Sequence, residues 1–599
     1  MGDDLVMTAN DTECDPPGRP PHSFPTDYLK VAGVHVPKHG AETIDYSDGN
    51  EQEEYLLQVI RNARDVSLFS PEIARSIRDW TSTYHLSPRR ANLLRPFSTM
   101  LRSRVLEVGA GCGAMTRFLG EVGGDVVAVE GSHRRALIAR ERTRNLDNVV
   151  IVADRLNDFG SSQLFDVITL IGVLEYSRIY VKETSDPEQK LLSHLLRILK
   201  PDGVLILAIE NKVGLKYLAG APEDHLGVPF AGVNDNYTAD SVVTFGELEL
   251  REHLDAAGFR KQRWYFPCPD YKLPVTILSH SVISEHRELA ATLLAQSVVR
   301  DPQPIDRPSF SLEQAWSVVA KNGLVDKLAN SFLVVAGRST AALANCDQDG
   351  SIAWHYATDR HPAFNKQARF VPRESEIIVE RSRLQEEPAP AAPLECILES
   401  ERLIGGSNWW LELCSIVNKP NWTVRQIADW ARIWIDALLH ENELAEFNED
   451  TFRKRVSGRY LDAIPGNMIC QADGATRFID QEWRSVQDIE FGFLMFRGLK
   501  DSLSRITSCA APAPGTRANV NGLIADVFAE LGVKVPRAEI DRLLLLELEV
   551  HCWVQGRNKE DISEETMTLS RNTCLAPRML LDRRNKEDKW RRWRRWPWT

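Results

Sequence analysis

The stretch Val105-Leu-Glu-Val-Gly-Ala-Gly-Cys-Gly-Ala114 decides the fold of this 599-residue chain. An apolar run of strand type leads into a loop that contains Gly109, Gly111 and Gly113, and a helix is predicted to begin near Met115. Glycine lets the backbone approach a ligand closely and adopt positive φ angles. Taken alone, a Gly-x-Gly-x-Gly loop is a weak signal, because dinucleotide-binding folds use similar loops.

The sequence around this loop alternates short β-rich runs with helical stretches, from Arg104 to about Ile277. Repeated strand–helix alternation is typical of an α/β fold, in which helices cover both faces of a parallel sheet. The runs of strand type cover residues 105–108, 126–129, 149–152, 167–170 and 204–209.

Three acidic residues stand where these strands end, and they narrow the choice of ligand. Glu107 precedes the glycines, where it would repel a pyrophosphate and attract a cationic amino-acid head group. Glu130 ends the second strand, where a carboxylate can accept hydrogen bonds from both hydroxyls of a ribose. Asp154 ends the third strand, where it can accept a hydrogen bond from an adenine amino group.

This array resembles class I S-adenosylmethionine-dependent methyltransferases, and the resemblance spans roughly residues 80–280. It implies a Rossmann-like fold with S-adenosyl-L-methionine as the cofactor. The alternative is a nucleotide-sugar or dinucleotide enzyme with the same topology. By the resemblance, the cofactor-binding residues are Glu107, Gly109, Gly111, Gly113, Glu130 and Asp154.

Four segments that flank the predicted strands resemble methyltransferases associated with bacterial surface-polysaccharide and glycosyltransferase gene products. They cover residues 84–95, 210–217, 222–225 and 267–274. This resemblance implies that the acceptor is a cell-surface polysaccharide or its lipid-linked precursor, methylated on a sugar hydroxyl or a sugar phosphate. It also implies glycosyltransferases as partners.

One residue in these segments is a candidate catalytic base for methyl transfer. His225 follows the fifth strand, near where acceptors bind, and the alternative is a loop histidine without a catalytic role. Glu175 and Tyr176, after the fourth strand, are further candidates. A base is needed only when the acceptor must lose a proton, so a phosphate acceptor would need none.

A second group of polar residues surrounds the segment Tyr460-Leu-Asp-Ala-Ile-Pro-Gly-Asn-Met-Ile-Cys470, which contains Asp462 and Asn467, and Asp480 follows the next apolar run. Phosphoryl transfer needs an acid that positions the attacking hydroxyl, and oxygen ligands for Mg²⁺ on the nucleotide phosphates. The pattern resembles the protein-kinase-like superfamily, closest to aminoglycoside phosphotransferases. It implies an α+β kinase-like domain that uses Mg²⁺ and ATP, with Asp462 as catalytic base and Asn467 and Asp480 as metal ligands. The alternative is a chance turn.

The nucleotide-binding half of such a domain is less distinct in the sequence. Residues 354–370, where a glycine-rich loop is expected, contain no glycine. Arg381 stands about where a phosphate-binding lysine is expected, and Lys366 is the nearest lysine in a neighbouring strand. Arginine is a poor substitute at a site shaped for a compact ammonium. The sequence therefore leaves open whether this domain phosphorylates a substrate or only binds a ligand.

Together the two halves resemble bifunctional enzymes that terminate lipopolysaccharide O-antigen chains, in which a sugar hydroxyl is phosphorylated and the phosphate is then methylated. Two other function classes stay open: a non-catalytic scaffold that recruits glycosyltransferases, and an RNA or protein methyltransferase. The formal net charge of −12 disfavours nucleic acid as a partner, because such a surface repels phosphate backbones.

The sequence predicts a cytoplasmic protein, because it shows no signal peptide and no apolar run of the ~20 residues that a membrane-spanning helix needs. The tail at residues 589–599 combines tryptophan with five basic residues and no acid, which favours contact with the inner face of the cell membrane. Docking on the protein's own acidic surface or on nucleic-acid bases is the alternative. The predicted segments are a disordered leader (1–40), a helical extension (41–95), the methyltransferase domain (96–285), the kinase-like domain (286–507), a linker (508–519), a helical C-terminal region (520–588) and the tail (589–599).

Overall fold

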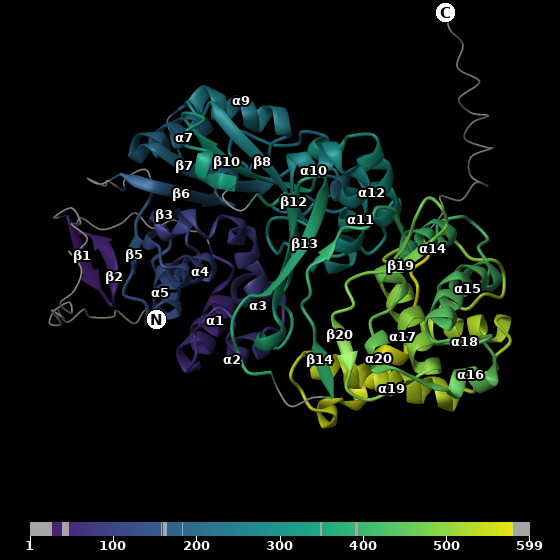
Figure 1. Ribbon diagram of the computed structural model, residues 1–599. Coiled ribbons are helices and arrows are strands. Elements are labelled where there is room, and N and C mark those ends of the chain that lie inside the picture. The colour runs from purple at the N-terminus through teal and green to yellow at the C-terminus, as the bar shows by residue number, and fades with distance from the viewer. Residues whose placement is uncertain are drawn as a thin grey trace, which may run out of the picture.

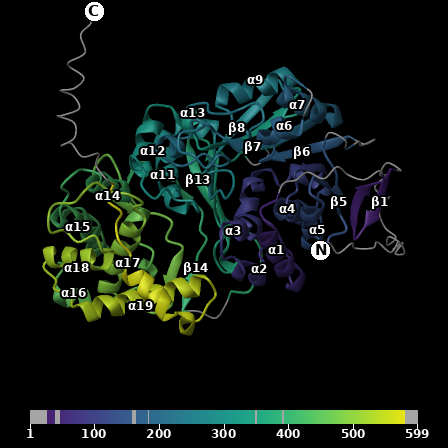
Figure 2. The same ribbon diagram turned by 180° about the vertical axis from the view of Figure 1, so that it is seen from behind.

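The computed structural model describes residues 27–38, 47–156, 159, 164–181, 184–347, 350–389 and 393–578. Figure 1 shows two parts that lie side by side, and Figure 2 shows the same parts from behind. The first part is built on one large sheet with helices around it, and the second part is mostly helical.

The large sheet has fourteen strands. Its strands from β2 to β7 in spatial order run parallel to their neighbours, and the remaining pairs are antiparallel. In spatial order the strands are β1 (Tyr28–Val31), β2 (Val34–Pro37), β5 (Val149–Ala153), β4 (Asp125–Glu130), β3 (Arg104–Val108), β6 (Phe165–Ile171), β7 (Leu199–Glu210), β10 (Ser331–Gly337), β8 (Lys261–Cys268), β9 (Thr276–Ser279), β11 (Ala353–Ala357), β12 (Lys366–Arg373), β13 (Glu376–Arg383) and β15 (Glu401–Arg402).

Helices cover both faces of the parallel strands, as the sequence predicts. Side chains alternate between the faces of a strand, so Leu106 packs in one core with Leu192 of α7, and Val105 packs in the other with Phe118 of α4. The helices of this part are α1 (Asn50–Asn62), α2 (Pro71–Arg75), α3 (Trp80–Leu86), α4 (Ala114–Val122), α5 (His133–Arg142), α6 (Ser177–Tyr180), α7 (Pro187–Ile198), α8 (Leu215–Leu218), α9 (Glu247–Ala257), α10 (His280–Glu285), α11 (Arg287–Ser297), α12 (Leu312–Lys321) and α13 (Val325–Leu328).

The five predicted parallel strands are all present, and the Rossmann-like fold is confirmed. The boundary predicted at residue 285 is wrong, however, because β10 is inserted antiparallel between β7 and β8. Every residue of β10 is buried, as expected for an apolar strand in the centre of a sheet. Strands β9 and β11 then continue the same sheet, so the sheet does not end where the strand–helix alternation ends.

The disordered leader predicted for residues 1–40 is also wrong in part. Residues 28–37 form the hairpin β1–β2, and Val34 pairs with Ile151 of β5 in parallel register. Val34 is fully buried, so the hairpin gains its stability from an apolar contact with the sheet that lies far away in sequence. Residues 1–26 lie outside the described residues.

The second part of the chain has one helical core. Trp410, Trp434 and Phe496 lie in this core together with Val527 and Leu543 of the C-terminal region. Its helices are α14 (Trp409–Val417), α15 (Val424–Glu441), α16 (Glu449–Arg453), α17 (Phe491–Ser504), α18 (Val520–Glu530), α19 (Arg537–Val554) and α20 (Glu564–Arg571). Its short strands are β14 (Leu394–Cys396), β16 (Ser407–Asn408), β17 (Arg455–Val456), β18 (Met468–Cys470), β19 (Thr476–Phe478), β20 (Trp483–Ser485) and β21 (Ile489–Glu490).

The segment predicted as a linker (508–519) packs against this helical core. The indole N–H of Trp422 donates to the carbonyl of Ala510 at 2.9 Å, and both residues are buried. The C-terminal helices therefore complete the second part instead of forming a separate region. The tail at residues 589–599 lies outside the described residues, and no helix in the described part is long and apolar enough to cross a membrane.

Candidate functional site

The glycine loop has the backbone conformation that the sequence predicts. Gly109, Gly111 and Gly113 have φ angles of 75°, 56° and 83°. A β-carbon on Gly113 would lie 2.8 Å from the Cα of Ala139, and one on Gly109 would lie 2.5 Å from the Cγ2 of Val173. Both positions therefore require glycine for conformation and for space.

Glu130 closes this loop from the end of β4. Its Oε2 accepts a hydrogen bond from the backbone N–H of Gly111 at 2.7 Å, and its Oε1 accepts one from Ser132 at 2.9 Å. A carboxylate offers about four lone-pair directions, so two acceptor positions stay available for the hydroxyls of a ribose.

Asp154 is held at the end of β5 by its neighbours. Its Oδ1 accepts from the N–H of Arg155 at 2.8 Å, and its Oδ2 accepts from the hydroxyl of Tyr28. Tyr28 comes from the N-terminal hairpin, which sequence reasoning assigned to a disordered leader. The sequence holds no local signal for this contact, because the two residues are 126 positions apart.

Glu107 is the group that fits a cationic ligand. Its side chain is 4% exposed, and its Oε2 has no hydrogen-bond partner in the described part of the chain. Burial raises the pKa of Glu107 to about 8, and the charge of Glu130 adds to the increase. A ligand ammonium would supply the missing partner, which is the interaction predicted for the amino-acid end of S-adenosyl-L-methionine.

A cavity of about 290 Å³ brings the predicted cofactor residues together. Glu107, Gly109, Gly111, Glu130 and Asp154 line it, whereas Gly113 lies behind the loop at the start of α4. The residue types fit S-adenosyl-L-methionine, whose sulfonium supplies a methyl group when the cofactor is bound.

Helix α3 contributes residues to this cavity that sequence reasoning did not assign to it. Tyr84 and His85 line the cavity, and Nε2 of His85 lies 2.8 Å from Oδ2 of Asp48. Burial lowers the pKa of His85, but Cys112 and Asp48 raise it by more, to about 9. Tyr84 and His85 lie in the segment 84–95, whose distinctive sequence was the available signal for their role in the cavity.

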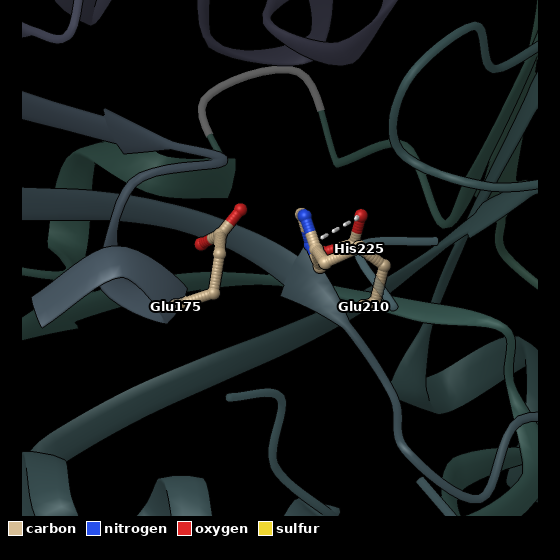
Figure 3. A group of neighbouring side chains, drawn as sticks. All are labelled: Glu175, Glu210 and His225. Carbon is tan, nitrogen blue, oxygen red and sulfur yellow. Dashed lines mark ion pairs between the residues drawn. The ribbon is translucent and has the colours of Figure 1, made fainter. Parts of the chain in front are cut away.

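Glu175 and His225 line another part of the same cavity, and the buried side chain of Glu210 lies beside His225 (Figure 3). Glu175 follows β6, Glu210 ends β7, and His225 lies in the loop after α8. Nε2 of His225 lies 3.7 Å from Oε1 of Glu210, and Nδ1 of His225 lies 3.3 Å from the hydroxyl of Tyr176. We call this group the acceptor-end cluster.

The ionisable groups of the acceptor-end cluster change one another's pKa values. Burial lowers the pKa of His225, but its interaction with the carboxylate of Glu210 raises it to about 9. Burial raises the pKa of Glu175 to about 8. His225 therefore holds its proton at neutral pH in this state, which opposes the role of base that the sequence suggests for it; that role stays a prediction.

Three of the distinctive sequence segments meet behind the acceptor-end cluster. The ammonium of Lys272 contacts Glu210 and lies 3.1 Å from Asp224. The ammonium of Lys216 lies 3.4 Å from Asp224 and 3.0 Å from Asp270. These residues belong to segments 210–217, 222–225 and 267–274, so the three segments form one buried network of ion pairs.

A second cavity, of about 560 Å³, lies at the junction of the two parts of the chain. Its lining comes from α11, β12 and β13, and from the segments 401–408, 466–469 and 479–480. Its apolar lining includes Leu293, Phe370, Val379, Ile469 and Ile479. Asn467 and Asp480 line the polar end.

The hairpin β18–β19 brings the predicted metal ligands together. Asn467 precedes β18 and Asp480 follows β19, and Nδ2 of Asn467 donates to the carbonyls of Asp480 and Asp462 at 3.3 Å and 3.0 Å. Nε of Arg381 lies 2.8 Å and Nζ of Lys366 lies 3.1 Å from Oδ1 of Asp480. Both cations that the sequence singled out therefore reach the same carboxylate.

Two of the residues predicted to take part in phosphotransfer, Asp480 and Asp462, have properties that are typical of functional sites. Asp480 has a φ of 48°, which is rare for a residue other than glycine. Burial raises the pKa of Asp462 to about 7, although Arg497 lies 3.6 Å away and opposes the increase. A perturbed carboxyl beside a strained one marks a candidate site and does not by itself define a reaction.

Comparisons with known proteins agree with the first site. A family described as a methyltransferase domain matches residues 106–205. The fold and this match define a Rossmann-like class I methyltransferase domain within the chain. This domain is S-adenosylmethionine-dependent, as the sequence predicts, and S-adenosyl-L-methionine is its cofactor.

Several solved structures are similar to this part of the chain. The N-methyltransferase NodS from Bradyrhizobium japonicum WM9, in complex with S-adenosyl-l-homocysteine, is 21% identical over 27% of this chain and 75% of its own, with a TM-score of 0.19. A SAM-dependent methyltransferase from Aquifex aeolicus is 21% identical over 32% of this chain and 88% of its own, with a TM-score of 0.23. The CcbJ methyltransferase from Streptomyces caelestis is 14% identical over 46% and 98%, with a TM-score of 0.26. No curated protein matches the chain.

Proposed function

We propose that this methyltransferase modifies a cell-surface polysaccharide or its lipid-linked precursor. The observation that carries the proposal is the convergence of segments 210–217, 222–225 and 267–274 at the acceptor end of the cofactor cavity. These are three of the four segments whose sequence resembles polysaccharide-associated methyltransferases. Residues close to the place where the acceptor is expected bear more directly on the choice of substrate than residues on a distant surface.

The pairing of Lys272 favours a sugar hydroxyl over a sugar phosphate. The ammonium of Lys272 is already paired with Glu210 and Asp224, so a phosphate would have to compete with two carboxylates for it. A hydroxyl brings no charge and does not need this cation. We therefore place the sugar hydroxyl first among the two acceptors that the sequence left open.

A second proposed activity is phosphotransfer by residues 286–507 together with the C-terminal helices, as a kinase-like domain. The specific observation in its favour is that Asn467, Asp480 and Lys366 meet at one end of the second cavity, next to apolar walls that suit a nucleobase. Asn467 and Asp480 would hold Mg²⁺ on the phosphates of ATP, and Asp462 would accept the proton of the attacking hydroxyl. Lys366 and Arg381 would stabilise the phosphate charge.

The same observations are compatible with a scaffold in which both cavities bind ligands and recruit glycosyltransferases. A scaffold would bind S-adenosyl-L-methionine without producing S-adenosylhomocysteine. We place the protein in the cytoplasm, with peripheral contact at the membrane through residues 589–599. RNA and protein acceptors rank below glycans, because the net charge of −12 opposes RNA and no segment resembles an RNA-binding module.

The test uses the full chain with lipid-linked glycans extracted from a producing cell. Isotope-labelled S-adenosyl-L-methionine is added with and without Mg·ATP, and the glycans are analysed by mass spectrometry. The proposal predicts one added methyl group at a sugar hydroxyl without ATP, and an added phosphate only with ATP. Transfer to protein or RNA, or cofactor binding without S-adenosylhomocysteine, would contradict it. The matched control is Asp154→Ala, which should bind less cofactor and transfer less methyl.

A further inference from the structure

The acceptor-end cluster offers three metal-ligand atoms from three different elements. One carboxylate oxygen each from Glu175 and Glu210 and one imidazole nitrogen from His225 lie within 4.8 Å of one another. Glu175 and Glu210 are each 1% exposed, and Figure 3 shows their side chains on the two sides of His225. The three ligand atoms thus lie close together in the interior of the protein.

The ligand atoms of this cluster lack other partners. Both carboxylate oxygens of Glu175, Oε2 of Glu210 and Nε2 of His225 are buried without a hydrogen-bond partner among the described residues. A buried polar atom without a partner destabilises the folded protein, and a charged one does so more strongly. A single cation between the three side chains would satisfy all of these atoms at once.

The groups around the cluster hold each ligand in place. The hydroxyl of Tyr176 lies 3.3 Å from Nδ1 of His225, which leaves Nε2 to face the cluster. Glu223 accepts from the backbone N–H of His225 at 2.8 Å and fixes its loop. Lys272 occupies Oε1 of Glu210 and leaves Oε2 available. Metal ligands are commonly oriented in this way by residues that do not touch the ion.

We propose that Glu175, Glu210 and His225 bind a divalent metal ion at the acceptor end of the methyltransferase cavity. Two carboxylates and one imidazole suit Mn²⁺, Fe²⁺ or Zn²⁺ better than Ca²⁺, which takes six to eight oxygen ligands. Three protein ligands leave coordination positions open on the cavity side, where the acceptor enters.

The role of the ion, unlike its binding, rests on the proposed function. An acceptor hydroxyl that coordinates the ion becomes more acidic and loses its proton to water. The oxygen then forms a bond to the methyl carbon as the sulfonium–methyl bond breaks, which leaves S-adenosylhomocysteine. The ion would thus activate the acceptor, because a His225 that ligates the metal is not available as a base.

The test is a titration with Mn²⁺ alone, followed by the electron paramagnetic resonance signal of the free ion. The full chain carries Asp480→Asn, so that the second cavity contributes no metal ligand set. We expect one bound Mn²⁺ per chain, with a Kd that rises at least tenfold in Glu175→Gln. The exposed control Glu252→Gln should bind as the parent does. Equal binding by Glu175→Gln, or no stoichiometric binding by the parent, overturns the proposal.

Pulsed resonance gives a second readout that does not depend on how well a variant folds. Mn²⁺ bound to His225 should show coupling to an imidazole nitrogen, and His225→Asn should lose that coupling. Absence of nitrogen coupling in the parent also overturns the proposal. Calorimetry with S-adenosyl-L-methionine separates this outcome from failure of the proposed function: a chain that binds the cofactor and no Mn²⁺ contradicts the metal site alone.

Discussion

The hydroxyl of Tyr28 donates a hydrogen bond to Oδ2 of Asp154, across the edge of the sheet where β2 pairs with β5. Tyr28 is the first residue of β1, and Asp154 directly follows β5 in the cofactor cavity. The N-terminal hairpin thus reaches the residue that the sequence predicts to bind the adenine end of the cofactor. An element that precedes the methyltransferase fold in sequence helps to position its site.

Replacing Tyr28 with phenylalanine should weaken cofactor binding while the hairpin stays folded. The variant loses one hydrogen bond to a carboxylate, which corresponds to about 1.5 kcal/mol or roughly tenfold in Kd. Calorimetry with S-adenosyl-L-methionine measures the change. The control is Leu29→Ala, since Leu29 is half-exposed on the same strand. If both variants bind with the affinity of the parent, Tyr28 does not position Asp154.

Glu130 should contribute more than Tyr28, because it is predicted to contact the cofactor directly. Glu130→Ala removes the acceptor of the ribose hydroxyls and also the partner of the Gly111 N–H. Hydrogen bonds to a charged group contribute about 1.5–3 kcal/mol, which corresponds to a Kd roughly 10 to 150 times higher. Glu130→Gln keeps one oxygen as a hydrogen-bond acceptor, so its Kd should lie between those of the parent and of Glu130→Ala. An unchanged Kd for Glu130→Ala would remove this residue from the cofactor site.

The residues that sequence reasoning found are those whose environment is set locally. Glu107 and Glu130 end strands whose apolar pattern is visible, and Asn467 meets Asp480 through a short hairpin. The residues that it missed depend on contacts distant in sequence. Tyr28 reaches Asp154 through pairing with β5, and β10 enters the sheet after more than 120 residues. No local pattern encodes such pairing.

Cofactor binding should release a proton near neutral pH, because burial raises the pKa of Glu107 to about 8. At pH 6.5 the empty site holds this carboxyl protonated, and a ligand ammonium favours its ionised form, so binding expels the proton. Calorimetry in buffers of different ionisation enthalpy should give close to one proton released at pH 6.5, and fewer as the pH rises through 8. Glu107→Gln should release none.

The same group makes the stability of the empty protein depend on pH. A folded-state pKa above the ordinary value of 4.5 means that the folded chain binds this proton more tightly than the unfolded chain. The resulting stabilisation is complete below pH 4.5 and is lost as the pH rises through about 8. Glu107→Gln should flatten this contribution to the thermal unfolding curve between pH 5 and 8. If the parent protein releases no proton when it binds S-adenosyl-L-methionine, Glu107 does not contact the ammonium group of the ligand.

Asp480→Asn should abolish Mg²⁺-dependent nucleotide binding in the second cavity. Asp480 is the acid on which Lys366 and Arg381 converge, and it supplies the charge that a metal on the phosphates requires. Thermal shift with Mg·ATP should stabilise the parent and leave the variant unchanged. The control is Asp473→Asn, an exposed acid in the turn of the same hairpin. A parent without any shift would leave the proposed phosphotransfer without support.

Gly113→Ala should destabilise the methyltransferase fold more than the same change at Gly123. Both glycines have left-handed backbones, with φ of 83° and 98°, so each substitution costs about 1–2 kcal/mol of backbone strain. Only Gly113 is crowded: its added β-carbon would lie 2.8 Å from the Cα of Ala139, whereas nothing lies within 4 Å at Gly123. Overpacking adds about 1–3 kcal/mol. Urea unfolding followed by tryptophan fluorescence should therefore show a lower midpoint for Gly113→Ala than for Gly123→Ala. Equal midpoints would mean that the contact of the added β-carbon with Ala139 does not destabilise the fold.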